Sequence, residues 1–156
     1  MAYNPDHEND PDNLRRFLAR TKEAHPDLYN RAFRRLCKLT KRDADDPLEA
    51  EFDGCVAALE QIYFEESGRR KRASRITWKR EKDGVLETFR YLAMKSEPSD
   101  GFKHLVNHGL AEFTAEHVVL RYPDRFPLEA VEASRRRLME HGIPIPSGLE
   151  SEVPTP

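Results

Sequence analysis

The chain is poor in cysteine and has no long apolar run. Only two of its 156 residues are cysteines, Cys37 and Cys55, and both lie among apolar residues at helical spacing. Two such residues predict neither a disulfide framework nor a zinc site, because a reduced cysteine in that setting behaves as a small hydrophobic side chain. No stretch of about 18 apolar residues is present, so no transmembrane helix is expected. Residues 1–10 are polar and acidic, unlike a signal peptide, and we expect a cytoplasmic location.

The chain also lacks the motifs that carry common enzyme chemistry. Its seven glycines are isolated from one another, so there is no Gly-rich phosphate loop, and no Gly-x-Ser-x-Gly elbow is present. Neither cysteine has a histidine at a recognisable spacing, and no carboxylate pair stands out by an apolar setting. The sequence therefore favours a protein without catalytic activity and predicts no cofactor.

One histidine pair has the spacing of a metal site. His104 and His108 lie four residues apart, which places two imidazoles on the same side of a helix. A third ligand would have to come from Glu116 or His117, and no glutamate follows the first histidine as the zinc-protease motif requires. We instead interpret both residues as surface histidines near a helix C-terminus, where cations are favoured.

The composition itself favours an all-α fold. Hydrophobic residues make up 38% of the chain and charged residues 35%, so the apolar side chains must be gathered on one face of each element. Amphipathic helices with charged outer faces achieve this. No Asn-Gly or Asp-Gly turn has the alternating flanks of a hairpin. We predict a single domain of about seven helices over residues 11–142, preceded by a flexible N-terminus at residues 1–10.

Residues 11–67 are expected to form a three-helix bundle. Asp10-Pro11 and Asp46-Pro47 each place a capping carboxylate before a proline, a favoured helix start. The first two helices are predicted over residues 11–24 and 26–40, with a polar turn over residues 41–46. The third helix carries apolar residues spaced 4, 3, 4 and 3, the pattern of a helix buried along its length. These residues are Leu48, Phe52, Cys55, Leu59 and Ile62.

Residues 84–142 are expected to form a cluster of short helices. These helices are predicted to begin at Asp83-Gly84, at Ser99 or Asp100, at Thr114 and at Pro127. The apolar residues expected to face inward are Val85, Leu86, Phe89, Leu92, Ala93, Phe102, Leu105, Val106, Val118, Val119, Leu120, Leu128, Val131, Leu138 and Met139. Residues 143–156 hold four prolines without periodicity and are expected to be extended or disordered.

The basic segment, residues 68–83 (GRRKRASRITWKREKD), is the most distinctive feature of the chain. Eight cations stand against one glutamate within residues 69–82, a net charge of +7 that leaves −9 for the rest of a chain with net charge −2. If the segment is helical, its only apolar stripe is Ala73, Ile76 and the Thr77 methyl, so most of it must face water. Cations this close repel one another, and an anionic partner would relieve that repulsion.

Phosphate is the commonest such partner, and its neutralisation releases counterions. Arginine suits bidentate phosphate or guanine contacts, and Trp78 could stack on an unpaired base. We therefore hypothesise a non-catalytic nucleic-acid-binding accessory or regulatory protein acting on DNA or RNA. The residues proposed to bind nucleic acid are Arg69, Arg70, Lys71, Arg72, Ser74, Arg75, Thr77, Trp78, Lys79, Arg80 and Lys82.

Other interpretations of the basic segment remain open. The protein could be a helical interaction module, an adaptor or inhibitor, that binds an acidic protein surface. The segment could instead be a solvated face, with Trp78 anchored in the core. Its cations could also pair with acidic residues of the same chain, or with those of a second copy in a homodimer. The acidic residues considered for this pairing are Asp43, Asp45, Asp46, Glu65 and Glu66.

Two short helices offer a second possible contact with DNA. Residues 100–107 and 114–121 flank a turn that contains Gly109, as in a helix-turn-helix module. The second of these helices is apolar in its later half and carries one cation, whereas a recognition helix usually exposes several polar side chains. We therefore favour two packed core helices here.

Overall fold

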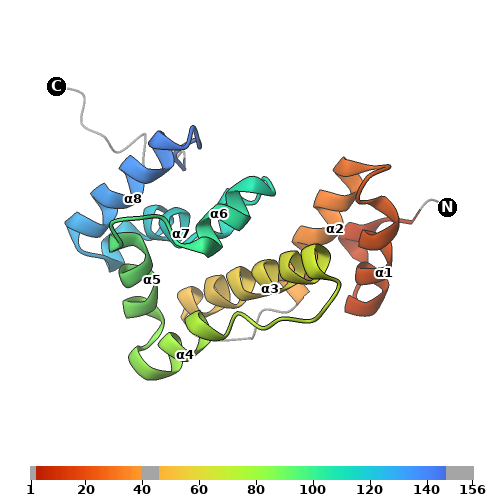
Figure 1. Ribbon diagram of the computed structural model, residues 1–156, viewed down its shortest axis with the longest axis horizontal. Helices are drawn as coiled ribbons and strands as arrows, with labels where there is room; N and C mark the ends of the chain where they lie inside the picture. The colour runs from red at the N-terminus through yellow and green to blue at the C-terminus, as the bar shows by residue number, and fades with distance from the viewer. Residues whose placement is uncertain (1–2, 40–45, 147–156) are drawn as a thin grey trace. The chain divides into compact units, whose positions relative to one another are not determined.

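The computed structural model describes residues 3–39 and 46–146, and over these ranges the protein is built from helices without strands. The helices are η1 (Pro5–His7), α1 (Pro11–Thr21), α2 (Pro26–Leu39), α3 (Pro47–Ser67), α4 (Ser74–Asp83), α5 (Val85–Met94), α6 (Asp100–Asn107), η2 (Ala111–Phe113), α7 (Ala115–Arg121), η3 (Pro123–Arg125) and α8 (Leu128–Glu140) (Figure 1). The predicted all-α fold is confirmed. The described residues hold eight α-helices rather than about seven, because part of the basic segment is itself helical.

No helix in the described ranges is both long enough and apolar enough to cross a membrane. Most of the polar turn predicted at residues 41–46 lies outside the residues that the structure describes, as do residues 147–156 of the proline-rich tail.

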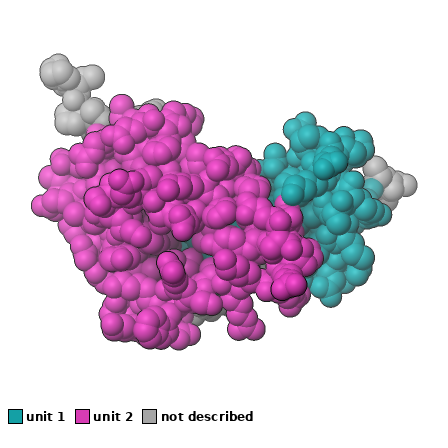
Figure 2. Space-filling model, in the orientation of Figure 1, with its two compact units in different colours: residues 1–58 teal, residues 59–156 magenta. Residues whose placement is uncertain are grey.

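The chain divides into two compact units, residues 1–58 and residues 59–156, so that the boundary falls within α3 (Figure 2). In the first unit, α1 and α2 pack against each other. The Asp10 carboxylate accepts a hydrogen bond from the backbone N–H of Asp12 and caps α1, as the sequence predicts. α1 ends at Thr21, three residues earlier than expected, and the Thr21 hydroxyl donates to the carbonyl of Phe17.

Residues 3–9, part of the segment predicted to be flexible, contact both helices of the first unit. The Tyr3 ring lies 4.8 Å from the Phe17 ring, centroid to centroid. Arg31 of α2 forms an ion pair with Asp6 at 2.8 Å, and the Arg35 guanidinium donates to the carbonyl of Glu8. Two arginines on the outer side of α2 therefore hold this segment, a role that its polar composition does not reveal.

The start and the buried side of α3 follow the sequence prediction. The Asp46 carboxylate accepts from the backbone N–H of Leu48 at 3.0 Å and caps the helix. All five residues of the predicted 4-3-4-3 pattern are buried, and Leu48 and Ile62 are fully so. Leu59 packs on α6, where its Cδ1 lies 3.4 Å from the position that a Cβ would occupy at Gly101. A Cβ at residue 101 would therefore make ordinary van der Waals contact with Leu59, which shows how closely α6 approaches this residue.

In the second unit, α5, α7 and α8 pack around one another and α4 packs on α5 (Figure 1). The core contains most of the apolar residues expected there, but Leu86, Leu128 and Met139 are 40%, 67% and 64% exposed, so their predicted inward orientation was wrong. The inner side of α8 is formed instead by Ala130, Val131, Ser134, Arg137 and Leu138. The sequence rule chose apolar residues for that side and therefore overlooked an arginine.

Candidate nucleic-acid interface

The basic segment consists of an irregular stretch, residues 68–73, followed by α4. Gly68 ends α3 with φ +73°, a left-handed conformation that favours glycine, and its N–H donates to the carbonyl of Phe64. The chain then turns back beside α3 toward α4 (Figure 1). Ala73 is buried, and its backbone N–H donates to the Glu60 carboxylate of α3 at 3.0 Å. The segment is therefore attached to the unit through its backbone, which leaves its charged side chains free to point outward.

α4 has one half-buried side and one exposed side. Ile76, Thr77, Lys79 and Arg80 are half-buried, because this side packs toward α5. The opposite side is exposed and carries Ser74, Arg75, Trp78, Glu81 and Lys82. Residues three and four apart are neighbours on a helix surface, so Arg75 and Lys82 flank Trp78 on either side along the helix.

Trp78 is 71% exposed, the highest value among the large hydrophobic side chains described. It does not anchor the segment in the core, so the interpretation that gave it this role was wrong. Exposing a large apolar ring to water is unfavourable in free energy, and a partner that covers the ring would remove this cost.

Five cations of the segment are exposed and make no ion pair among the residues that the structure describes. They are Arg69, Arg70, Arg72, Arg75 and Lys82. Lys71 is also exposed, and its ammonium lies 5.2 Å from the centroid of the Tyr63 ring on α3. The side-chain charge of this surface is therefore strongly positive, with Glu81 as the acidic residue on the exposed side of α4.

The remaining proposed residues are engaged within the unit. Lys79 forms an ion pair with Asp83 at 2.6 Å, which raises the pKa of Lys79 and lowers the pKa of Asp83. The Lys79 ammonium also lies 4.7 Å from the centroid of the Tyr91 ring. The Thr77 hydroxyl donates to the carbonyl of Ala73 at 2.9 Å, so its proton is already used by the helix. The site therefore centres on residues 69–75, Trp78 and Lys82.

The acidic residues considered as partners for the segment have other contacts. Glu65 accepts a hydrogen bond from Gln61, and the Glu66 carboxylate lies 3.2 Å from Nδ1 of His104. Asp46 caps α3 as described above, whereas Asp43 and Asp45 lie outside the described residues.

His104 and His108 each have a polar contact within the second unit. Nδ1 of His108 lies 2.9 Å from the carbonyl of His104, and its Nε2 lies 3.9 Å from the Glu66 carboxylate. No group of three histidine, cysteine or carboxylate side chains within the described part of the chain could hold a metal ion. His141 makes the same contact with the carbonyl of Arg137, also at 2.9 Å. His108 and His141 each follow the last residue of a helix, as the sequence predicts for His108, but His104 and His108 are half-buried rather than fully exposed.

α7 is not available to read a DNA groove. Five of its seven residues are buried: Ala115, Glu116, Val118, Val119 and Leu120. Its cation, Arg121, donates to Nδ1 of His117 and to the carbonyl of Glu112. α7 is therefore a core helix, as the sequence favours, and its burial argues against its use as a recognition helix.

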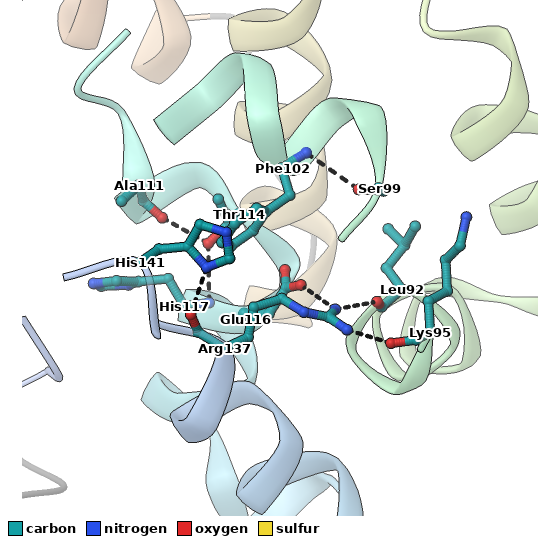
Figure 3. Close-up of polar contacts among 10 residues, drawn as sticks. All are labelled: Leu92, Lys95, Ser99, Phe102, Ala111, Thr114, Glu116, His117, Arg137 and His141. Atoms are coloured by element: carbon teal, nitrogen blue, oxygen red, sulfur yellow. Dashed lines mark hydrogen bonds and ion pairs between the residues drawn. The ribbon is translucent and has the colours of Figure 1, made fainter. Parts of the chain in front are cut away.

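The second unit also contains a buried ion pair that the sequence interpretation missed. The Arg137 guanidinium lies 2.7 Å from the Glu116 carboxylate and donates to the carbonyls of Leu92 and Lys95 (Figure 3). Glu116 is 2% exposed; burial raises the pKa of its carboxyl, and the hydrogen bond from Arg137 opposes that rise. The pair joins α7 and α8 to the end of α5. The sequence signal for a buried Arg137 was its helical spacing from Ser134 and its position next to Leu138, both of which are buried.

No protein-family model, curated protein or solved structure matches this chain.

Proposed function

We propose that this protein binds nucleic acid without catalysis, through the exposed cations of residues 69–75 together with Trp78 and Lys82 on α4. The observation that carries the proposal is the exposed Trp78 ring between Arg75 and Lys82 on one side of a helix. Cations along a backbone track, combined with an aromatic ring on which a base stacks, are the usual means of binding single strands. We therefore expect a preference for unpaired DNA or RNA.

Charge supports the same proposal. Five exposed cations without ion pairs among the described residues repel one another, and bound phosphates would remove that repulsion while releasing counterions. The local attachment of the segment through Ala73 and Glu60 means that binding would not need to unfold the unit. An acidic protein surface could neutralise the charges equally well, but it would not offer the exposed Trp78 ring a base on which to stack.

The test is the salt dependence of binding to a fluorescent mixed-sequence single strand and to the matching duplex. The logarithm of the affinity should fall linearly with the logarithm of salt concentration, with a slope of about 0.7 per phosphate contact for single strands. Changing Arg70, Arg72, Arg75 and Lys82 together to glutamate should abolish binding at moderate salt and leave the helical circular dichroism unchanged. A matched control changes four exposed cations outside the segment, Arg20, Lys22, Lys38 and Lys103, to glutamate and should retain most binding.

The two variants separate local recognition from general charge. Equal losses in both would mean that net charge alone drives the interaction, which contradicts a site on α4. If the unmodified protein binds neither strand form at low salt, nucleic-acid binding is wrong. The segment would then be tested as a site for an acidic protein, by comparing proteins retained by the unmodified chain and by the glutamate variant.

A further inference from the structure

α8 carries two large apolar side chains that are exposed among the residues that the structure describes. Leu128 and Met139, near its two ends, are 67% and 64% exposed. Glu132 and Arg135 lie between them, and the four residues are spaced 4, 3 and 4 along the helix. At 100° per residue they fall within about 60° of one another around the helix axis, so they form one continuous stripe.

Two copies of this stripe match each other when the two helices run antiparallel. An antiparallel copy of the helix, related by a two-fold axis midway between residues 132 and 135, would place Leu128 against Met139 of the partner subunit. The same operation would place Glu132 against Arg135 of the partner subunit. The interface would therefore contain two apolar contacts and two ion pairs in all, because the two-fold symmetry repeats each pairing once.

Of the two charged residues of the stripe, Glu132 is exposed and Arg135 is half-buried. Neither Glu132 nor Arg135 makes an ion pair among the residues that the structure describes, although they lie on the same helix. The Nε atom of Arg135 is shielded from solvent and has no hydrogen-bond partner in that part of the chain. A shallow hollow on the same side is lined by Glu132, Arg135, Arg136, Met139 and Glu140. An apolar pair at the ends and opposite charges in the middle favour a second copy of this chain over an unrelated partner.

We propose that the protein forms a homodimer in which the outer faces of two α8 helices pack antiparallel. α8 has 13 residues and is therefore about 20 Å long. An interface confined to one helix is smaller than those of stable complexes, so dissociation in the micromolar range or weaker is expected. This dimer does not depend on nucleic acid, and its failure would leave the proposed function of the basic segment unaffected.

Charge exchange tests the pairing directly by sedimentation velocity over a concentration series of the full chain. Glu132→Arg and Arg135→Glu should each raise the dimer dissociation constant by about tenfold or more, because each places like charges opposite one another twice. The double variant with both changes should restore dimerisation. An equimolar mixture of the two single variants should form a heterodimer, since one chain then carries two arginines and the other two glutamates. Glu23→Arg, with the same charge change on an exposed residue of the first unit, should dimerise like the unmodified chain.

Cross-linking determines the orientation of the helices. Chains carrying Leu128→Cys and chains carrying Met139→Cys should form a mixed disulfide when combined. Neither variant should cross-link to itself, because residues 128 and 139 are about 16 Å apart along the helix, too far for a disulfide. A protein that stays monomeric at the highest accessible concentration would overturn the proposal. Dimerisation unaffected by Glu132→Arg, or self-cross-linking of either cysteine variant, would also overturn it.

Discussion

Arginine has two opposite environments in the second unit. Arg137 is 8% exposed and donates to the Glu116 carboxylate and to two backbone carbonyls. Arg70, Arg72 and Arg75 are exposed and make no ion pair within the described residues. Arg137 therefore stabilises the fold, whereas the exposed arginines are accessible to a binding partner.

The difference lies in what each position costs when it is changed. Removing Arg137 would leave a buried carboxylate and the carbonyls at the end of α5 without a donor, and buried groups in that state are strongly destabilising. Removing an exposed arginine returns a solvated site to water. The exposed arginines are thus expected to contribute little to folding, and the proposed role in binding would account for their concentration in a single segment.

The largest effect is expected at the buried pair. Arg137→Met should lower the free energy of unfolding by about 3–5 kcal/mol, because it leaves Glu116 buried without its partner. Urea denaturation followed by circular dichroism measures the loss. Arg75→Met, the same change in the exposed setting, should leave the denaturation midpoint unchanged. Similar losses of stability in the two variants would contradict the distinction between the buried and the exposed arginines.

The pH dependence of the Arg137→Met variant sharpens this test. Burial raises the pKa of Glu116 above its ordinary value of 4.5, and the hydrogen bond from Arg137 lowers it. Without Arg137 the pKa should rise further, so the folded state holds its proton more tightly than the unfolded state does. The stabilisation from this proton is then complete below the pKa of Glu116 in the unfolded state, and it is lost as the pH rises through the pKa of Glu116 in the folded state. The deficit relative to the unmodified protein should therefore shrink between pH 7 and pH 4.5, and Glu116→Gln in the same chain should remove this dependence.

The next largest effect is expected in the apolar core beside the basic segment. Leu59 is 5% exposed and lies against Gly101. Leu59→Ala should cost about 2–5 kcal/mol, as large-to-small core changes do. Leu128→Ala makes the same change at an exposed residue and should cost little at concentrations where the chain is monomeric. A loss below about 1 kcal/mol for Leu59→Ala would show that the core prediction fails at this position.

A smaller effect is expected where the basic segment joins α5. Gly84 has φ +91° and ψ 164°, a region that is essentially restricted to glycine. Gly84→Asn should therefore cost about 1–3 kcal/mol through backbone strain. Gly68, with φ +73°, adopts the left-handed conformation that asparagine tolerates, so Gly68→Asn should be milder. Thermal unfolding of the two variants compares them, and equal losses would contradict the strain assigned to Gly84.

The fold was predictable where periodicity and capping residues agreed. The spacing of five apolar residues and the carboxylate of Asp46 sufficed to place α3, and Ser99 and Thr114 cap α6 and α7 as expected. Periodicity gave less guidance for α8, where Leu128 and Met139 are apolar yet exposed and Arg137 is charged yet buried. Which side of a helix is buried depends on tertiary contacts. Arg137 is buried because Glu116 of α7 pairs with it, and no pattern within α8 reveals that partner.

The candidate site was predictable as a charged segment but not as a surface. The sequence indicated which residues carry its charge, while the conformation of the segment was left open. The division of its cations into exposed and engaged groups depends on the packing of α4 on α5. Lys79 contacts the Tyr91 ring of α5, for example, and no pattern within residues 68–83 reveals that contact.

The smallest effect on stability, and the most informative for function, is expected at Trp78. Its ring is 71% exposed, so Trp78→Ala should change the free energy of unfolding by no more than about 0.5 kcal/mol. If a base stacks on this ring, the same change should weaken binding to a single strand by about 1–3 kcal/mol and binding to a duplex much less. Trp78→Phe should recover part of the loss, because a smaller ring still offers a stacking face. Fluorescence anisotropy at one fixed salt concentration measures all three proteins, and equal weakening on single strand and duplex would mean that Trp78 does not stack on bases.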